Sequence, residues 1–159
     1  MKTTAIYPGT FDPITFGHID LVKRASKMFD HIIVAVADNK EKQTLFSLGE
    51  RINLVQSIFA GLNSISIKTF SGLLTEFAKQ QKCNVILRGL RVVSDFDYEL
   101  QMANMNRKLV PNLETIFLTP DDNYIHVASS LVRTIAKEHG DLSPFVPPEI
   151  AQALKEKLV

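Results

Sequence analysis

"AIYPGTFDPITFGHIDLVKRA" (residues 5–25) joins a short apolar run to a helical pattern across a loop that holds two prolines. Apolar side chains then recur at Ile19, Val22 and Ala25, a spacing close to the 3.6 residues of one helical turn. We expect this helix to begin between residues 15 and 17, after the loop's second proline. A strand that passes directly into a helix is the first half of a βαβ unit, and it predicts a parallel sheet.

The rest of the chain repeats this alternation of strand and helix patterns. Runs rich in β-branched residues predict four more strands, and runs with apolar residues three or four apart predict helices between them. Right-handed crossovers then favour a doubly wound sheet. The sequence therefore predicts one α/β domain over residues 1–159, with a Rossmann-like, five-stranded parallel sheet, helices on both faces and a C-terminal helix. The expected strands are residues 3–7, 31–37, 64–70, 84–89 and 114–120.

Several helix ends are marked in the sequence. Ser47 and Glu50 have the spacing of a capping box at the start of a second helix. Apolar residues over 73–78 mark a third helix. We also expect a short helix that ends at Gly140, and a last helix over residues 147–159 with proline in its first turn. A fourth helix, ending before a proline, is indicated by Tyr98, Met102, Met105 and Leu109.

Composition is that of an ordinary globular protein, with 45% hydrophobic and 22% charged residues. The formal net charge of +1 gives no general attraction to nucleic acids or acidic membranes, so neither is expected as a partner. No run approaches the roughly 20 apolar residues of a membrane helix, and no N-terminal signal pattern is present. These absences predict a soluble protein. Cys83 is the sole cysteine and cannot form an internal disulfide, which fits a reducing cytoplasm.

Ligands of doubly wound sheets bind beyond the carboxyl ends of the strands. The loop after the first strand places Thr10 there, and the helix that follows presents free backbone amides, which form an anion site together with the helix dipole. His18 follows within the pattern T-x-G-H, where its imidazole would lie over a bound anion. The alternative is that glycine and proline only turn the chain, and that His18 is a half-exposed helix residue.

Two further loops carry cations. Lys42 lies in the polar loop after the second strand, where Lys40 competes with it for any role. Arg88 ends an apolar strand and Arg91 follows across a glycine-containing turn. A guanidinium at such a position needs an anion or a carboxylate beside it. The two arginines are therefore candidate anion ligands, or ion-pair partners of the carboxylates just downstream, which are Asp95, Asp97 and Glu99.

The fourth such loop contains Ser129 and Ser130 before a helical pattern, where serine is a favoured N-cap. A second helix end at the same crevice would add to the anion site. The sequence has no P-loop, no G-x-G-x-x-G and no G-x-S-x-G. Its four histidines and Cys83 show no metal-ligand spacing, so no metal site is expected. Cations, amides and hydroxyls suit transfer to or from phosphate, in which positioning and charge stabilisation dominate.

Three segments, "YPGTFDPITFGHIDLVKRA" (7–25), "RGLRVVSDFDYELQMANMNRKL" (88–109) and "ASSLVR" (128–133), closely resemble the bacterial phosphopantetheine adenylyltransferases of coenzyme A biosynthesis. That family belongs to the nucleotidyltransferase superfamily marked by (H/T)-x-G-H. The resemblance covers essentially the whole chain. It implies reversible transfer of an adenylyl group from ATP to 4′-phosphopantetheine, which gives dephospho-coenzyme A and pyrophosphate by in-line attack without a covalent enzyme intermediate. It also implies Mg²⁺ bound with ATP, a homohexamer, and coenzyme A as a candidate inhibitor.

The resemblance assigns roles to individual residues. It implies that His18 stabilises the transition state, with Thr10 beside it at the α-phosphate. It implies that phosphopantetheine contacts Thr10, Lys42, Leu74 and Arg88, with Lys42 and Arg88 at its phosphate. The implied ATP contacts are Thr10, Phe11, His18, Gly89, Leu90, Arg91, Glu99, Tyr124, Ile125, His126, Val127, Ala128, Ser129 and Ser130.

One position departs from the family pattern. Ala128 stands where the family commonly has the first of three serines, and it cannot offer a hydroxyl to the nucleotide, so we expect a modest change in ATP affinity. Two other functions stay open. The chain could be another small nucleotidyltransferase with a different phosphate or alcohol acceptor, or a non-catalytic nucleotide-binding module. Such a module has no use for His18, and the cations Lys42 and Arg88 favour an anionic acceptor without naming it.

Overall fold

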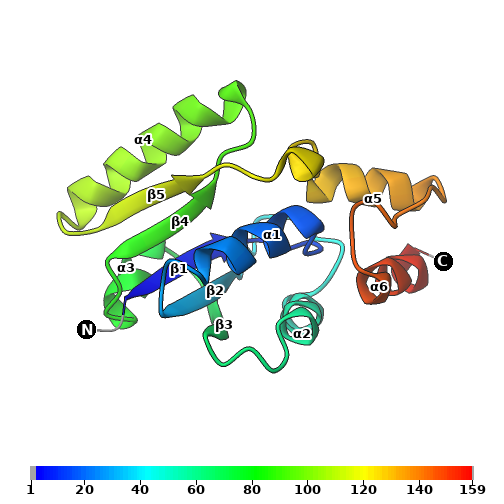
Figure 1. Cartoon of the computed structure of the whole chain (residues 1–159), viewed down its shortest axis with the longest axis horizontal. Coiled ribbons are helices and arrows are strands. Elements are labelled where there is room, and N and C mark those ends of the chain that lie inside the picture. Colours follow the sequence, from blue (N-terminus) through cyan, green and yellow to red (C-terminus); the bar gives the residue numbers. More distant parts are fainter. Residues whose placement is uncertain (1–2, 159) are drawn as a thin grey trace.

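The computed structural model describes residues 3–158, which form a five-stranded parallel sheet with helices on both sides (Figure 1). Within these residues, no helix is both long and apolar enough to cross a membrane. The last expected helix is present, but its final residue, Val159, lies outside the described residues. The strands are β1 (Thr4–Gly9), β2 (His31–Ala37), β3 (Ile65–Phe70), β4 (Val85–Gly89) and β5 (Glu114–Leu118). The helices are α1 (Phe16–Ala25), α2 (Leu48–Ile58), α3 (Leu74–Gln80), α4 (Val93–Leu109), the 3₁₀ turn η1 (Asp122–Tyr124), α5 (Ser129–Lys137) and α6 (Pro148–Leu158).

The strands lie in the order β3-β2-β1-β4-β5, and every neighbouring pair is parallel. The chain first extends the sheet from β1 to β3 and then returns to the other side of β1 with β4 and β5. This is the predicted doubly wound topology. The direction of winding reverses between β1 and β4, so the crevice expected to bind ligand lies at the carboxyl ends of these two strands.

Alternation along the strands divides the interior into two cores. Ala5 and Tyr7 of β1 face the larger core, which they share with α1, α2, α5 and α6. Ile6 points the other way, into a smaller core with Phe77 and Ala78 of α3. Both faces of the central strand are therefore buried, which explains why the strand patterns in the sequence are nearly continuous apolar runs.

The elements agree with the sequence prediction, with small shifts at their ends. β1 continues two residues beyond the expected strand, to Gly9. α1 begins at Phe16 after the N-cap Thr15, inside the predicted window. The capping box of α2 is present: the amide of Ser47 donates to Glu50 Oε2 at 2.7 Å, and the amide of Glu50 donates to Ser47 Oγ at 3.3 Å.

Both ends of α5 differ from the prediction. Its N-cap is Ala128, and Ser129 is already the first helical residue, so the predicted serine cap is wrong. At the other end, His139 adopts the left-handed conformation, with φ of 55°, in place of Gly140. Gly140 is required for space, because a Cβ at this position would lie 2.7 Å from Cγ2 of Ile135. At the N-terminal end, the hydroxyl of Ser129 bonds to the distant carbonyl of Pro13, a contact that the sequence spacing does not contain.

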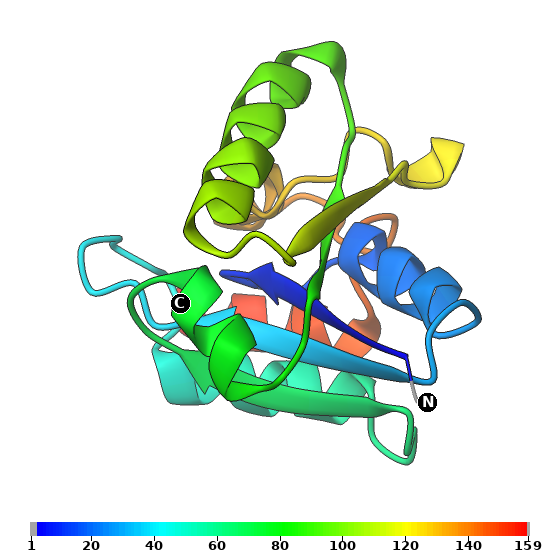
Figure 2. The ribbon, with the colours of Figure 1, turned by 90° about the vertical axis from the view of Figure 1, so that its left-hand side faces the viewer.

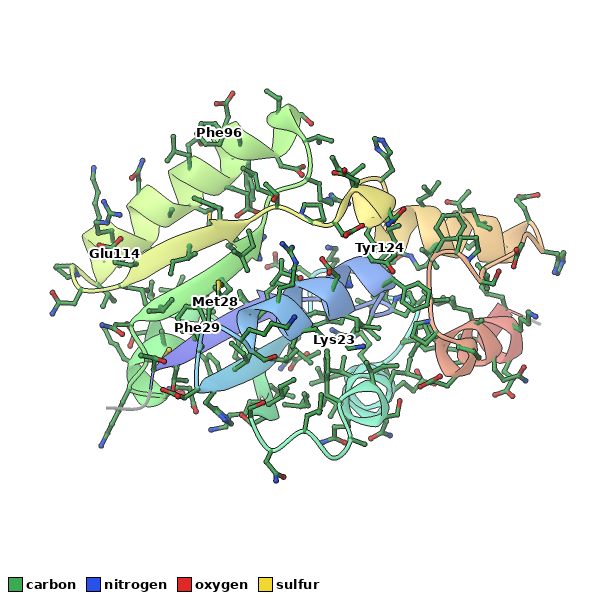
Figure 3. The ribbon with its side chains drawn as sticks, viewed as in Figure 1. Lys23, Met28, Phe29, Phe96, Glu114 and Tyr124 are labelled. Carbon is green, nitrogen blue, oxygen red and sulfur yellow. The ribbon has the colours of Figure 1, made fainter. Side chains whose placement is uncertain are left out.

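α4 was predicted correctly as a helix, but its apolar side chains are not buried by the rest of the described chain. Tyr98 is 63% exposed and Met105 is 56% exposed, whereas Glu99 is the helix's buried residue. Figure 2 shows α4 beside β5, standing apart from α1, α2 and α3. Phe96 lies on the outer side of this helix (Figure 3). The periodicity that predicted α4 therefore marks surfaces that are open within one chain.

Candidate active site

A cavity of about 430 Å³ opens at the carboxyl ends of β1 and β4, at the reversal of strand order. Its walls come from the loop between β1 and α1, the loop after β2, the turn and helix after β4, and the segment from η1 into α5. Four places singled out in the sequence thus meet in one crevice.

Gly9 and Phe11 shape the loop after β1. Phe11 has a φ of 50°, in the left-handed region that residues other than glycine seldom adopt, and its side chain is almost fully buried. A Cβ on Gly9 would lie 2.9 Å from Cζ of the Phe11 ring, so glycine leaves the room that this ring occupies. The Phe11 ring meets the imidazole of His18 edge to face, with centroids 5.0 Å apart. The loop thereby supports one side of the imidazole.

The hydrogen bonds of His18 define its proton position. The backbone amide of Thr15 donates to Nδ1 at 3.0 Å, and Thr15 Oγ1 lies 3.1 Å from the same nitrogen. Because Nδ1 accepts, the proton of the neutral ring is on Nε2. Burial, reinforced by the positive charges of Arg91 and Arg88, lowers the pKa of His18 to about 4. At neutral pH, the ring is therefore uncharged, and its Nε2–H can donate to a ligand.

A buried arginine holds the strand ends that flank the cavity. Arg51 of α2 is 2% exposed, and its Nη1 donates to the carbonyl of Thr10 at 2.7 Å and to that of Ala37 at 2.9 Å. Arg51 thus ties the end of β1 to the end of β2. It positions Thr10 and the start of the loop that carries Lys42.

Arg88 and Glu99 form a bidentate ion pair at the end of β4, in which Nε donates to Oε2 at 2.9 Å and Nη2 donates to Oε1 at 2.5 Å. Nε of Arg91 lies 3.5 Å from a carboxylate oxygen of Asp95. The side chains of Arg88 and Arg91 remain 34% and 41% exposed and line the cavity. The carboxylate and anion-binding interpretations of these arginines are therefore compatible.

Lys42 and Arg133 add two more cations. Of the two lysines that the sequence offered, Lys42 lines the cavity, and it makes no ion pair with any carboxylate of residues 3–158. Nη1 of Arg133 donates to the carbonyl of Asp12 at 2.6 Å and lies 3.6 Å from its carboxylate. That carboxylate also accepts the amides of Leu45 and Phe46, at 2.8 and 2.9 Å. Asp12 therefore fixes the end of the loop that bears Lys42.

The N-terminus of α5 is left without a side-chain cap. The N-cap Ala128 has no oxygen on its side chain, and the hydroxyl of Ser129 donates elsewhere, to the carbonyl of Pro13 at 2.8 Å. The amide of Val132 is the first to bond back to Ala128. In the described structure, the amides of residues 129–131 thus have no partner. They form a helix-end anion site at the edge of the cavity.

An aromatic pair borders the same edge. The ring of Tyr124 stacks on Phe16, with centroids 5.8 Å apart and an interplanar angle of 30°. Tyr124 lies where η1, α1 and α5 meet (Figure 3), and it lines the cavity. The cavity therefore has an apolar aromatic surface next to its phosphate-binding groups.

The cavity collects most of the residues predicted from the sequence. Leu90 is outside it, because its amide donates to the carbonyl of Leu118 in β5 at 2.9 Å. Leu74, at the start of α3, and Ile125 and His126, before α5, also do not line it. The predicted residues that line it are Thr10, Phe11, His18, Lys42, Arg88, Gly89, Arg91, Glu99, Tyr124, Val127, Ala128, Ser129 and Ser130.

Sequence reasoning missed four residues of this region: Tyr7, Asp12, Arg51 and Arg133. Arg133 had a detectable signal, since it follows Ser129 by four residues and shares its helix face. The other three, Tyr7, Asp12 and Arg51, had no such signal. A tyrosine in a strand usually indicates a core position, and an arginine in a helix usually indicates a solvated face. Only the fold shows that Arg51 is buried beneath the loops.

No group of three His, Cys, Asp or Glu side chains in the described part of the chain is arranged to hold a metal ion. Cys83 does not line the cavity; it lies at the amino ends of β1 and β4, where its Sγ donates to the carbonyl of Thr4 at 3.2 Å. The cavity offers hydrogen-bond donors and positive charge, groups that bind phosphates and stabilise their transfer.

Phosphate-binding groups on several sides of one crevice, at the switch point of a doubly wound sheet, are what the nucleotidyltransferase class requires. The sequence comparison identifies the family within that class. Residues 6–135 match the cytidylyltransferase-like family, and the chain belongs to it.

Solved structures share the fold. A nicotinic acid mononucleotide adenylyltransferase from Plasmodium falciparum, complexed with NaAD, aligns with a TM-score of 0.74 at 17% identity over 98% of this chain and 96% of that one. A protein from Vibrio parahaemolyticus assigned as a nicotinate-nucleotide adenylyltransferase gives 0.70 at 18% identity, over 99% and 95% of the two chains. A lipopolysaccharide core biosynthesis protein from Thermoplasma volcanium gives 0.58 at 22% identity, over 77% and 100%. At these identities, the likeness establishes the fold.

Proposed function

We propose that this protein transfers an adenylyl group from ATP to 4′-phosphopantetheine, giving dephospho-coenzyme A and pyrophosphate. The observation that carries the proposal is the meeting, in one cavity, of a neutral imidazole donor with Lys42, Arg88, Arg91 and Arg133. The sequence resemblance over residues 7–25, 88–109 and 128–133 supports the choice of acceptor.

The reaction needs no nucleophile from the protein. An oxygen of the acceptor's phosphate attacks the α-phosphorus of ATP, the bond from that phosphorus to the bridging oxygen breaks, and pyrophosphate leaves. His18 Nε2–H donates to the α-phosphate oxygens as their negative charge builds up. Thr10, held by the bond from Arg51 to its carbonyl, presents its hydroxyl and amide to the same group.

On the acceptor side, Lys42 and Arg88 hold the attacking phosphate. The wall that Asp95 and Glu99 of α4 contribute continues along the helix through Met102 and Asn106 at spacings of three or four residues. Met102 is 41% exposed and Asn106 is partly exposed, so this side of α4 offers a surface for the extended pantetheine arm, with Leu74 of α3 as a further contact.

On the nucleotide side, Arg91, Arg133 and the free amides of residues 129–131 would hold the leaving phosphates, and Tyr124 would contact the base. Mg²⁺ accompanying ATP would neutralise phosphate charge. The carboxylates of the cavity are already engaged: Glu99 with Arg88, Asp95 with Arg91, and Asp12 with two amides and Arg133. We therefore assign the ion to the phosphates of ATP, with no protein carboxylate as its ligand.

A panel of acceptors tests the proposal. Purified protein is incubated with ATP, Mg²⁺ and one acceptor at a time, and pyrophosphate release is followed. We expect turnover with 4′-phosphopantetheine and little with nicotinic acid mononucleotide. That second acceptor is the specific alternative, because structures with this fold include adenylyltransferases of that nucleotide. Turnover with the mononucleotide alone would refute the pantetheine proposal and retain the nucleotidyltransferase class.

His18→Ala separates an enzyme from a nucleotide-binding module. Removing one transition-state donor lowers turnover by roughly 100-fold or more, and ATP binding should weaken much less. A matched control is His139→Ala at the end of α5, outside the cavity. Full turnover by His18→Ala would show that the imidazole has no catalytic role.

We also propose that the protein assembles as a homohexamer in the cytoplasm. Support comes from the sequence resemblance and from the apolar side chains of α4 that one chain leaves exposed, among them Val93 and Phe96. Large exposed apolar surfaces commonly mark protein interfaces.

A further inference from the structure

Tyr7 is a buried tyrosine of β1 that opens onto the cavity and has no role in the reaction described above. Its side chain is 6% exposed and lines the cavity. The Tyr7 ring meets Phe11 edge to face, with centroids 5.6 Å apart, and its centroid lies 6.4 Å from that of His18. The phenol is therefore held in a fixed place directly beside the catalytic imidazole.

The hydroxyl of Tyr7 makes no hydrogen bond with any group of residues 3–158. It is also not sealed in the interior, since the side-chain atoms that are both buried and unpaired in those residues are Arg51 Nε and the hydroxyls of Thr75 and Thr115. The hydroxyl consequently faces the cavity. Buried tyrosine hydroxyls almost always have a partner, and the cavity is the side from which a ligand can supply one to Tyr7.

Charges around the phenol identify the chemistry of that ligand. Arg88, Arg91 and Glu99 are the charged groups that interact with the Tyr7 hydroxyl, and Glu99 is already occupied by Arg88. Burial raises the pKa of Tyr7 above its ordinary value, so the hydroxyl keeps its proton and acts as a donor. Tyr7 lines the same cavity as Arg88, Arg91 and the imidazole of His18, and a hydroxyl donor in such a cationic wall suits a phosphate oxygen.

We propose that the Tyr7 hydroxyl donates a hydrogen bond to an oxygen of the reacting phosphates, in the cavity that His18, Arg88 and Arg91 also line. It is thus a further catalytic residue of the site. This inference rests on the proposed function, because the phosphate belongs to ATP or to the phosphorylated acceptor.

Tyr7→Phe tests the inference, since it keeps the ring and removes only the hydroxyl. We expect kcat/KM to fall roughly tenfold or more, as for the loss of a hydrogen bond to a charged group. The thermal midpoint should stay the same or rise, because this hydroxyl makes no hydrogen bond within residues 3–158. Thr115→Val is the matched control: it removes an unpaired buried hydroxyl in β5, outside the cavity, and should leave turnover unchanged.

A spectroscopic measurement supplements the kinetics. The chain has three tyrosines, so ¹³Cζ-tyrosine resonances are few, and Tyr7→Phe assigns the one of interest. We expect ATP or pyrophosphate to shift the Tyr7 resonance. Two results would overturn the inference and leave the proposed function intact. One is wild-type turnover in Tyr7→Phe, and the other is a thermal midpoint lowered by several degrees together with lost activity. Wild-type protein that neither binds ATP nor releases pyrophosphate would overturn the proposed function, and the inference with it.

Discussion

At the scale of single residues, the backbone of Thr15 controls the protonation of His18. Its amide donates to Nδ1, so a second proton on the ring would break this bond at the start of α1. Arg88 and Arg91 oppose the added charge, and with burial they lower the pKa of His18 to about 4. We expect the His18 resonance to titrate near this pH in NMR spectra of the free protein, and its pKa to rise when ATP brings negative charge to Nε2. An ordinary pKa near 6.5 in the free protein would contradict the geometry.

The same pKa shift affects stability in acid. The folded pKa of His18 lies below the unfolded value of 6.5, so its contribution to stability is complete above pH 6.5 and is lost as the pH falls toward 4. We expect the free energy of unfolding, measured with urea, to fall more steeply over this interval in the wild type than in His18→Ala. Parallel pH profiles would show that His18 is not the group responsible.

Arg88 and Arg91 should be distinguishable by their effects on the two substrates. Arg88→Ala should raise KM for phosphopantetheine by roughly tenfold or more, and KM for ATP much less, because the charged hydrogen bonds are to the acceptor's phosphate. Arg91→Ala should do the reverse. Equal losses for both substrates would mean that Arg88 only shapes the loop.

A double variant separates binding from folding at Arg88. Glu99 is 8% exposed, so Arg88→Ala leaves a buried carboxylate unpaired and lowers the thermal midpoint. Adding Glu99→Gln removes that charge and should recover most of the midpoint, while KM for the acceptor stays high. Recovery of both quantities would assign Arg88 a structural role alone.

At the scale of elements, the uncapped start of α5 should contribute to anion binding through its backbone. Ser129→Pro removes the first helical amide, and proline suits this position because Ala128 before it is extended, with φ −123° and ψ 142°. We expect calorimetry to show several-fold weaker ATP binding than for Ser129→Ala, which removes the hydroxyl and keeps the amide. Equal affinities for the two variants would exclude the amide of residue 129 as a ligand.

The elements show which features a sequence can predict. Strand patterns, the box at Ser47 and the start of α1 depend on neighbours in the chain, and these predictions were confirmed. Thr10, His18 and Arg88 could be placed at one cavity because they follow or end strands, and the topology brings strand ends together. The cap at Ala128 could not be found, because it depends on a bond from the next residue to the distant loop before α1. The proposed role of Tyr7 could not be predicted either, because it depends on side chains that the fold brings near it, Arg88 of β4 and Glu99 of α4.

At the scale of the whole molecule, one chain leaves α4 and the edge strand β5 largely uncovered. Val93 is 91% exposed and Phe96 is 43% exposed, on one side of a helix whose inner side carries Glu99. The described chain thus buries Glu99, which lines the cavity, and leaves several apolar side chains of α4 open. A second copy of the chain could cover these apolar side chains.

If the protein is the homohexamer that the sequence resemblance implies, light scattering after size exclusion should give about six times the chain mass of 17.8 kDa. Phe96→Glu places a charge on the exposed apolar side and should lower the measured mass, because a charge buried at an interface without a partner is strongly unfavourable. Gln101→Glu adds the same charge to the same helix at a position that is already polar, and should leave the mass unchanged. A monomeric wild type would refute the assembly. Equal masses for both variants and an oligomeric wild type would place the interface away from Phe96.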